Sequence, residues 1–206
     1  MKKLAIVGAS GHGKVVADTA ELCGWIDISF FDDMWPLRLD NGAWAVVGTF
    51  DHLIERLRDF DAVVVAIGNN LIRQNKLSAL VLSGAVLATL VHPGAYVSQY
   101  ATVGAGTVIF AGAVLNAGAS VGVGGILNTG CSVDHDCILA ESVHISPGAR
   151  LAGGVFLGDR VWVGIGACVK QMVAIGSDAI VGAGAAVLAD VASGATVVGV
   201  PARPLE

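Results

Sequence analysis

The chain has 206 residues, a formal net charge of −5 and a hydrophobic content of 54%. The charge leaves no basic footprint, so nucleic acid is not an expected partner. The long stretch without charged side chains, residues 77–133, is interrupted every few residues by Gly, Asn, Ser or Thr, whereas a membrane-spanning helix needs about 20 consecutive apolar residues. The apolar run that follows Lys3 is too short for a signal peptide. We therefore expect a cytoplasmic protein that does not engage a membrane.

Residues 1–85 have the pattern of a small α/β domain in which short apolar strands alternate with helices. The expected strands cover residues 4–7, 28–31 and 62–67. The expected helices cover residues 15–22, a segment that begins with Asp51 as its N-cap, and residues 71–82. This order predicts a βαβ (Rossmann-like) domain with parallel strands.

The first expected strand ends in a glycine-rich turn, Gly8-Ala9-Ser10-Gly11-His12-Gly13-Lys14. Backbone N–H groups at the start of a helix attract phosphates, and Asp32 follows Gly13 by 19 residues, where an acidic side chain meets a ribose or a base edge. The turn departs from the usual GxGxxG because its second glycine is shifted by one, and without a ligand it would be a plain strand-to-helix connection. Three strands are also too few for a dinucleotide fold, so the nucleotide of a nucleotide sugar fits better than NAD.

From Val91 onward every sixth residue is aliphatic, and the series continues without exception to Val187. An α-helix cannot use a period of six, since 3.6 residues per turn would spread these side chains around its axis. Six-residue periodicity is the signature of a parallel β-helix, in which each six residues form one short strand and a corner. Three such units make one triangular coil, so residues 86–190 are expected to form about five coils.

Two further positions of the six-residue unit agree with this interpretation. A mostly small residue stands four positions after each aliphatic one, as at Ala113 and Ala119, where it lets the backbone turn a tight corner. Glycine often follows the aliphatic residue directly, as at Gly104, where a positive φ or close stacking of coils would be tolerated. The order lapses after Val187, so residues 191–206 are expected to be a C-terminal extension.

One segment of the predicted β-helix carries polar chemistry, from Asn128 to Asp136, and His144 follows nine residues after His135. Histidine suits general-base catalysis because its ordinary pKa lies near cellular pH, and either Asp134 or Asp136 can orient the ring. A histidine on such a wall can also be an exposed or interface residue, and His144 can equally contact a cofactor. Zinc is not expected, because a catalytic zinc site takes three protein ligands and the remaining histidines lie elsewhere in the chain.

Over essentially its whole length, the chain resembles the bacterial nucleotide-aminosugar N-acetyltransferases and the related sialic-acid O-acetyltransferases. The motifs that carry the resemblance are Gly8-Ala9-Ser10-Gly11-His12-Gly13-Lys14-Val15-Val16, Phe31-Asp32-Asp33, Gly68-Asn69, Asn128-Thr129 with Asp134-His135-Asp136, His144-Ile145-Ser146-Pro147-Gly148-Ala149 and Gly199-Val200-Pro201-Ala202-Arg203. The resemblance implies that the β-helix is left-handed, and that the N-terminal domain holds the nucleotide of a 4-amino-4,6-dideoxy sugar. It also implies a homotrimer with acetyl-CoA bound along the β-helix between neighbouring subunits.

The resemblance further implies roles for individual residues. His135 would be the general base, and Asp136, where family members often have Glu, would raise its basicity. The nucleotide sugar would contact Ser10, Gly11, His12, Gly13, Lys14, Asp32, Asp33, Gly68 and Asn69. The acetyl-CoA groove would be lined by Asn128, His144, Gly153, Gly164, Ile165 and Ala183.

The expected activity is a direct, acetyl-CoA-dependent N-acetylation without an acyl-enzyme. Three alternatives stay open at this point. The acceptor can be a hydroxyl, as on a sialic acid, with the same base and donor. The protein can be a sugar-nucleotide-binding trimer without turnover, or a β-helical zinc hydratase. The nucleotide (UDP, dTDP or GDP) and the stereochemistry of the sugar are also open.

Overall fold

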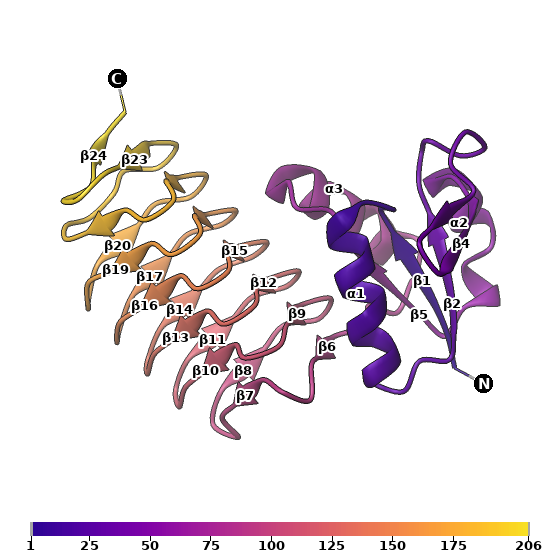
Figure 1. Ribbon diagram of the computed structural model, residues 1–206, viewed down its shortest axis with the longest axis horizontal. Helices are drawn as coiled ribbons and strands as arrows, with labels where there is room; N and C mark the ends of the chain where they lie inside the picture. Colours follow the sequence, from indigo (N-terminus) through magenta and orange to yellow (C-terminus); the bar gives the residue numbers. More distant parts are fainter. Residues whose placement is uncertain (1, 206) are drawn as a thin grey trace. The chain divides into compact units, whose positions relative to one another are not determined.

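The computed structural model describes residues 2–205, which form two compact units (Figure 1). The first unit ends at Pro93 and the second begins at Gly94. The fold class expected from the sequence is confirmed, because a Rossmann-like α/β unit is followed by a β-helix of hexapeptide repeats. None of the helices within residues 2–205 is long and apolar enough to cross a lipid bilayer.

The first unit is built on a five-stranded sheet with the strand order β3-β4-β2-β1-β5. Its strands are β1 (Lys3–Val7), β2 (Asp27–Phe31), β3 (Asp40–Asn41), β4 (Trp44–Gly48) and β5 (Ala62–Val65), and β6 (Leu90–Val91) lies near the end of the unit. Its helices are α1 (Gly11–Leu22), α2 (Phe50–Glu55), the 3-10 helix η1 (Leu57–Asp59) and α3 (Asn70–Leu82). The central strand β1 pairs in parallel with β2 and β5, and its residues from Leu4 to Val7 are buried, as expected for a parallel strand covered on both faces.

The sheet has more strands than the three that the sequence predicted. The hairpin of β3 and β4 is antiparallel, while β4 lies parallel to β2. Because β3 consists of two polar residues, the hairpin has no alternation of apolar and polar residues to reveal it. The additional strands widen the sheet on the side of β2.

The predicted N-cap of the second helix, Asp51, is wrong. Helix α2 is capped by Thr49, whose hydroxyl accepts the N–H of His52 at 3.4 Å while Nδ1 of His52 accepts the N–H of Thr49 at 3.2 Å. This reciprocal pair is a capping box in which histidine takes the place of the usual Glu or Gln. Asp51 lies in the first turn, where a carboxylate is favoured by the helix dipole.

The first unit is also longer than the predicted domain, which ended at residue 85. The N–H of Val63 donates to the carbonyl of Val86, and the N–H of Ala88 donates to the carbonyl of Val63, both at 2.8 Å. These bonds attach the segment around Leu87 to the edge of β5. The boundary therefore lies at Pro93, eight residues later than expected.

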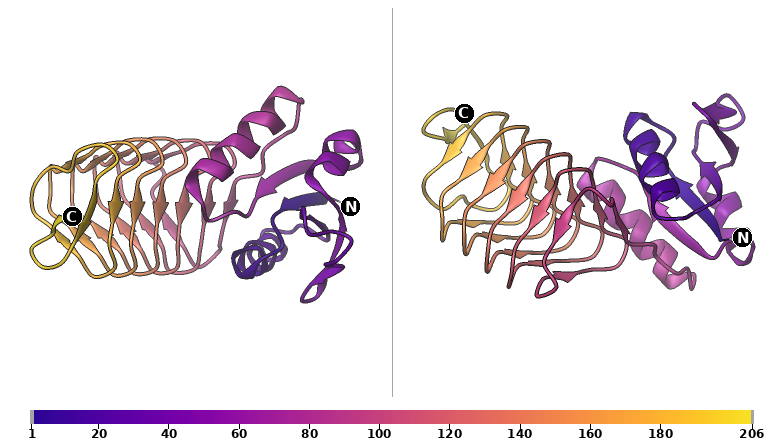
Figure 2. Two further views of the ribbon diagram at one scale, coloured as in Figure 1. Left: turned by 90° about the horizontal axis from the view of Figure 1, so that it is seen from above. Right: turned by 60° about the horizontal axis from the view of Figure 1, so that its bottom comes forward.

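The second unit is a triangular solenoid whose three walls are parallel sheets of short strands (Figure 2). Wall 1 contains β9 (Val108–Ile109), β12 (Ile126–Leu127), β15 (His144–Ile145), β18 (Trp162–Val163), β21 (Ile180–Val181), β23 (Thr196–Val198) and β24 (Arg203–Pro204). Wall 2 contains β7 (Tyr96–Val97), β10 (Val114–Leu115), β13 (Ser132–Val133), β16 (Arg150–Leu151), β19 (Cys168–Val169) and β22 (Ala186–Val187). Wall 3 contains β8 (Thr102–Val103), β11 (Ser120–Val121), β14 (Ile138–Leu139), β17 (Phe156–Leu157) and β20 (Ala174–Ile175).

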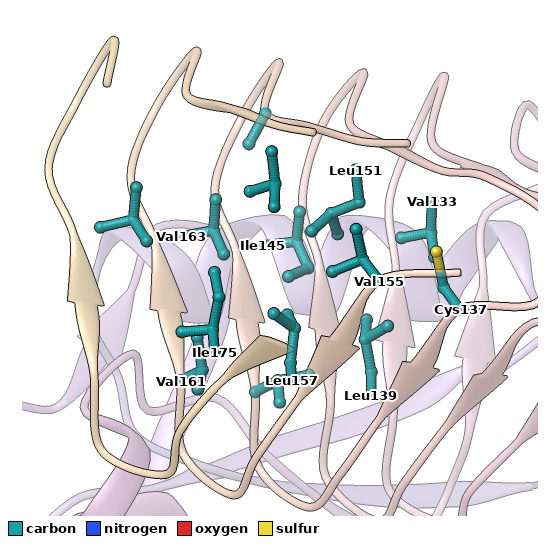
Figure 3. Packing of buried hydrophobic residues seen from close by; sticks show 14 of the residues in the cluster. Val133, Cys137, Leu139, Ile145, Leu151, Val155, Leu157, Val161, Val163 and Ile175 are labelled. Atoms are coloured by element: carbon teal, nitrogen blue, oxygen red, sulfur yellow. The ribbon is translucent and has the colours of Figure 1, made fainter. Parts of the chain in front are cut away.

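The aliphatic residues of the six-residue series from Val97 to Val187 fill the interior of this solenoid, whereas Val91, the first member predicted, belongs to the first unit and is 36% exposed. Each pairs with the residue 18 positions on, as Leu115 does with Val133, so one coil contains three repeats. Their side chains from all three walls point toward one another in the interior, where Ile145 and Leu157 are fully buried (Figure 3). The small residues expected at the corners, such as Cys137, are buried in the same core.

The turns between walls repeat one backbone conformation. Every sixth residue from Gly106 to Gly184 has a positive φ, and most of these residues are glycine. Asp136 occupies one of these turn positions with φ of 58°. The glycines that directly follow the aliphatic residues are needed for a different reason, namely close stacking of the coils. A Cβ on Gly104 would lie 2.5 Å from the carbonyl carbon of Gly122 in the next coil.

The series of core-facing aliphatic residues does not end at Val187, as the sequence suggested. Its next two members, Val191 and Val197, stand two residues earlier than the six-residue period would place them. Val191 bridges to Ile175 and Val197 pairs with Val181, each 16 positions apart instead of 18. The predicted C-terminal extension therefore begins by completing the last coil. The chain then turns back, and β24 pairs antiparallel with β23.

Candidate active site

A cavity of about 290 Å³ opens in the first unit at the carboxyl ends of β1, β2 and β5. In open α/β sheets, ligands bind at this edge. Four of the predicted nucleotide-sugar residues line the cavity, namely Ser10, Asp32, Asp33 and Gly68. Lys76 of α3, which sequence analysis did not single out, lines it as well.

The two adjacent acids in this cavity have different tasks. The carboxylate of Asp32 accepts the N–H of Ala9 at 2.7 Å and the N–H of Met34 at 3.0 Å, so it fixes the glycine-rich turn. Asp33 is exposed, and its Oδ2 lies 3.4 Å from Nζ of Lys76. The Lys76 ammonium also lies 3.8 Å from the ring centroid of Phe50, a cation–π contact that holds it at the cavity. Asp33 and Lys76 thus present an acceptor and a donor side by side.

The remaining predicted residues of this site support the cavity from outside its lining. Gly13 packs closely, since a Cβ there would lie 2.4 Å from the carbonyl oxygen of Gly8, and Gly11 lies in the open first turn of α1. Asn69 is the N-cap of α3, with its Oδ1 accepting the N–H of Ile72 at 3.0 Å. Contact of these residues with a nucleotide sugar stays a prediction.

His12 and Lys14 also lie beyond the cavity lining. Burial, with a contribution from the nearby Arg73 charge, lowers the pKa of His12 to about 4, so its imidazole is neutral at pH 7. Lys14 extends along the β3–β4 hairpin next to Gly42. Arg73 is itself buried and donates from Nη1 to the carbonyls of Ile67 (2.9 Å) and Gly68 (3.2 Å), which shapes the loop at the cavity.

In the second unit, His135 and Asp136 form a hydrogen-bonded pair on the edge between walls 2 and 3. Nδ1 of His135 lies 2.8 Å from Oδ2 of Asp136, and the imidazole is largely exposed. Asp134 instead accepts the backbone N–H of His135 at 2.8 Å and the side-chain amide of Asn116 at 2.9 Å. The structure thereby identifies Asp136 as the ring's partner and Asp134 as a support for the backbone.

The electrostatics of this edge favour a basic imidazole. The hydrogen bond to Asp136 raises the pKa of His135 above its ordinary value, and the charge of Asp134 adds to the effect. An ionised carboxylate only accepts hydrogen bonds, so Nδ1 carries the proton and Nε2 keeps its lone pair. No group of three or more His, Cys, Asp or Glu side chains suited to a metal ion occurs within residues 2–205.

Two glycines in the neighbouring coils make room for the pair. A Cβ on Gly118, 18 residues before Asp136, would lie 2.5 Å from its Oδ1. A Cβ on Gly153, 18 residues after His135, would lie 2.4 Å from Nε2 of the imidazole. Gly153, which the family resemblance placed in the acetyl-CoA groove, therefore lies directly against the basic nitrogen.

A groove of about 490 Å³ runs along wall 1 and its edge with wall 2. Five of the six residues predicted for acetyl-CoA line it, namely Asn128, His144, Gly164, Ile165 and Ala183. The sixth, Gly153, does not. The groove crosses the coils from β12 to β21, and most of its lining is apolar. An elongated groove with apolar walls suits a long, flexible ligand better than a compact one.

A chain of polar contacts orders the end of the groove near β12. The N–H of Thr129 donates to Oδ1 of Asn128 at 2.9 Å, which turns the amide nitrogen of Asn128 toward Nε2 of His144 at 3.2 Å. The His144 ring stacks on Trp162 with centroids 5.1 Å apart, and Nε1 of Trp162 donates to Ser146 Oγ at 2.8 Å. Since the Asn128 nitrogen only donates, Nε2 of His144 is an acceptor and not a proton donor here.

His135 and this groove lie on different edges of the triangle. The groove follows wall 1 and the edge between walls 1 and 2, whereas His135 follows β13 on the edge between walls 2 and 3. Large apolar side chains are exposed beside His135 too, with Ile138 54% and Phe156 45% exposed on wall 3 and Met172 76% exposed on the His135 edge. Two separate surfaces of one chain therefore carry the base and the groove.

Comparison with known proteins shows what this arrangement is similar to. Residues 3–80 match the model of the PglD N-terminal domain. The acetyltransferase domain of PglB from Neisseria gonorrhoeae FA1090, solved with acetyl coenzyme A, is 42% identical with a TM-score of 0.95 and 99% of each chain covered. PerB from Caulobacter crescentus, solved with CoA and GDP-perosamine, is 36% identical with a TM-score of 0.94, covering 100% of this chain and 98% of that one.

The chain belongs to the hexapeptide-repeat family of nucleotide-aminosugar N-acetyltransferases. A curated relative, UDP-N-acetylbacillosamine N-acetyltransferase of Bacillus subtilis (strain 168), is 37% identical over 113 residues. That match covers 54% of this chain and 52% of the relative, about half the length of each. The family resemblance expected from the sequence motifs is thus confirmed.

Several residues of the candidate site gave no signal in the sequence. Trp162 and Ile180 line the groove, but they stand at the outward position of the repeat, where any side chain is tolerated. Lys76 lies on a helix without a motif around it. Trp162 and His144 are 18 positions apart, which is one full coil, so they pair on neighbouring strands and their rings stack. A search for aromatic side chains 18 positions apart would have predicted this contact.

Proposed function

We propose that this protein transfers the acetyl group of acetyl-CoA to the amino group of a nucleotide-linked 4-amino-4,6-dideoxy sugar, with His135 as the general base. The observation that carries the proposal is the exposed His135–Asp136 pair, for which Gly118 and Gly153 leave space in the adjacent coils. The relatives supply the class of donor and acceptor, since one was solved with acetyl coenzyme A and another with GDP-perosamine.

The reaction follows from the state of the imidazole. Nε2 of His135 accepts a proton from the sugar amine as the amine nitrogen bonds to the thioester carbonyl carbon. The tetrahedral intermediate then collapses, the carbon–sulfur bond breaks, and the departing CoA thiolate takes up the proton held by His135. Asp136 keeps Nδ1 protonated and stabilises the imidazolium while it exists. No acyl-enzyme forms, so the cysteines have no part in the reaction.

The backbone of Gly153 is the part of the neighbouring coil proposed to assist this step. It lies next to Nε2 of His135, where the reacting carbon would also be. We assign its N–H as the donor to the oxyanion of the tetrahedral intermediate, a contribution typically worth about 3 kcal/mol. Alanine at this position would keep the N–H but crowd the ring.

The charge around His135 favours an amine over a hydroxyl as the acceptor. Asp134 and Asp136 flank the base, and Asp134 is held ionised because hydrogen bonds from the His135 N–H and from Asn116 lower its pKa. An amino sugar arrives mostly as an ammonium ion, which two carboxylates attract, and it loses one proton to solvent before the neutral amine attacks. A neutral hydroxyl carries no charge for the carboxylates to attract. The two carboxylates beside His135 therefore support N-acetylation over O-acetylation of a sialic-acid-type sugar.

In the first unit, the cavity takes the nucleotide. The glycine-rich turn at the start of α1 offers N–H groups to the phosphates. Asp33 and Lys76 supply an acceptor and a donor for the base edge or the ribose. A carboxylate accepts the ring N–H of uracil, thymine or guanine, and the ammonium donates to the neighbouring carbonyl of the same base.

The separation of His135 from the groove supports a homotrimer. One exposed apolar surface lies beside His135 on wall 3 and its edge with wall 2, and a different one forms the groove on wall 1. Two different surfaces that fit each other produce a head-to-tail contact, which closes into a ring when the rotation permits. In such a ring, His135 of one copy faces the acetyl-CoA groove of the next, and each active site needs two copies.

The proposed function is tested by measuring release of the CoA thiol with acetyl-CoA and a panel of UDP-, dTDP- and GDP-linked 4-amino-4,6-dideoxy sugars, with free sialic acid included. Rapid turnover on one aminosugar would establish the reaction and name the nucleotide. Turnover on sialic acid alone would contradict the proposal and favour O-acetylation. Binding of a nucleotide sugar without any turnover would favour a non-catalytic binding protein.

A further inference from the structure

Two consecutive glycines, Gly153 and Gly154, form the turn that follows His135 by one coil. Backbone hydrogen bonds hold this glycine pair between two other turns. The N–H of Gly154 donates to the carbonyl of His135 at 2.9 Å, and the N–H of Met172 donates to the carbonyl of Gly153 at 3.0 Å. His135 and Met172 are therefore the neighbours of the glycine pair in the coil before and the coil after.

The side chains of both neighbours lie over the glycine pair. The imidazole of His135 occupies the place that a Cβ on Gly153 would take, and the thioether sulfur of Met172 occupies the place of a Cβ on Gly154. Consecutive Cα atoms are about 3.8 Å apart, so the imidazole and the thioether cover adjacent residues. Met172 therefore bounds the space beside Nε2 of His135 on the side of the later coils.

The opposite side of His135 has no comparable bulk. In the coil before His135, the same turn consists of Ala117 and Gly118, and both are exposed. A ligand group that lies over the glycine pair is thus limited in length by the Met172 side chain and by no side chain of the preceding turn.

Methionine is an unexpected residue at this turn position. Met172 has a φ of 62°, and the residues one and three coils earlier, Gly154 and Gly118, are glycines with φ of 68° and 74°. The left-handed region is unfavourable for a residue with a Cβ, and strained residues of this kind gather at functional sites. The side chain is flexible and polarizable, which suits contact with a small apolar group of a ligand.

We propose that Met172 limits the length of the acyl group that the enzyme transfers. The inference rests on the proposed function, because it takes Nε2 of His135 and the N–H of Gly153 as the groups around the reacting carbonyl. The acyl chain begins one bond from that carbonyl carbon and so lies over the glycine pair. An acetyl methyl fits between Nε2 and the thioether, whereas each further methylene has to displace Met172.

The test compares kcat/KM for acetyl-, propionyl- and butyryl-CoA, with the aminosugar that the wild type acetylates fastest as acceptor. One methylene in a restricted pocket changes kcat/KM by about 10–200-fold, so the wild type should prefer acetyl-CoA to butyryl-CoA by about 100-fold or more. Met172→Gly should raise kcat/KM for butyryl-CoA at least about tenfold and leave that for acetyl-CoA within about threefold. Met172→Leu, which has a similar volume, should keep the wild-type preference.

Folding and assembly are checked with the same variants. Glycine suits a positive φ, so the melting temperature of Met172→Gly should not fall below that of the wild type. Ile138→Ala is the matched control, because Ile138 is also a large apolar side chain exposed beside His135 but belongs to wall 3. It should leave the ratio of kcat/KM for acetyl-CoA to that for butyryl-CoA unchanged.

Three results would overturn the proposal. They are an unchanged preference in Met172→Gly, a wild type that uses butyryl-CoA as efficiently as acetyl-CoA, and an equal loss of preference in Ile138→Ala, which would trace the preference to the contact between copies. A wild type without turnover on any of the three donors would instead overturn the proposed function itself.

Discussion

Replacing Gly153 with alanine places a methyl group against the proposed catalytic base. The new Cβ would lie 2.4 Å from Nε2 and 2.5 Å from Cε1 of His135, whereas non-bonded heavy atoms settle at about 3.5 Å. The ring must therefore move by about 1 Å, which breaks its 2.8 Å hydrogen bond to Asp136. Gly153 has no positive φ, so alanine fits the backbone itself.

The expected cost falls on catalysis and not on folding. A displacement of about 1 Å in a catalytic group reduces turnover about 10²-fold, so kcat of Gly153→Ala should fall by about that factor. The His135 side chain is 63% exposed and swings into solvent easily, so the free energy of unfolding should change by less than about 1 kcal/mol. The assay is CoA thiol release at saturating aminosugar, together with a thermal melt and a calorimetric Kd for CoA.

A double variant separates this explanation from general damage to the coil. Because the alanine acts through the imidazole, Gly153→Ala should cost little when His135→Ala is already present. If Gly153→Ala keeps a kcat within threefold of the wild type, the crowding argument is refuted. If it lowers the His135→Ala background by the same 10²-fold, the effect does not pass through the ring.

Three other substitutions have defined outcomes. His135 acts as a base only when it is neutral, and its pKa is raised, so kcat/KM should fall as the pH drops through a value above 6.5. Asp136→Asn should lower kcat and move this fall in kcat/KM to lower pH. If the fall stays at the same pH, the His135–Asp136 pair is not its cause. Lys76→Met should raise the KM for the nucleotide sugar about tenfold and leave the Kd for CoA unchanged, whereas equal effects on both ligands would indicate a folding defect. Leu157→Ala, at a fully buried position, should reduce the free energy of unfolding in urea by about 2–5 kcal/mol, and a loss below about 1 kcal/mol would mean that the coils relax around the cavity.

The β-helix could be predicted closely because its signal repeats. Each coil imposes the same demand for an inward aliphatic side chain, so positions from Val97 to Val187 reinforce one another. The last coil escaped because two residues are missing from its repeat, which brings Val191 and Val197 out of step with the series while both remain in the core. A fixed period cannot register such a deletion.

In the first unit the misses have local causes. The β3–β4 hairpin is short and begins with polar Asp40 and Asn41, so it has no period to detect. The true N-cap, Thr49, is followed at the third position by His52, which does not match the usual capping-box pattern. The end of the unit is set by hydrogen bonds between the segment around Leu87 and β5, and these cannot be predicted from the residues next to them in the sequence.

In the candidate site as well, features that are local in the sequence could be predicted and contacts between distant segments could not. The His135–Asp136 pair was predicted because chemistry-bearing residues are rare on the solenoid wall and these two are adjacent in sequence. The contact between Gly153 and His135 depends on stacking across one coil, and the place of Lys76 depends on how α3 lies against the sheet. Such relations appear only when distant segments are brought together.

The role of His135 is tested by the turnover of His135→Ala on the aminosugar that the wild type acetylates fastest. If His135 is the general base, the kcat should be lower by about 10²–10⁴-fold, with the Kd for CoA and the melting temperature close to those of the wild type, because an exposed base contributes to the reaction and little to folding. A folded variant that keeps near-normal turnover would contradict the assignment of His135 as the general base.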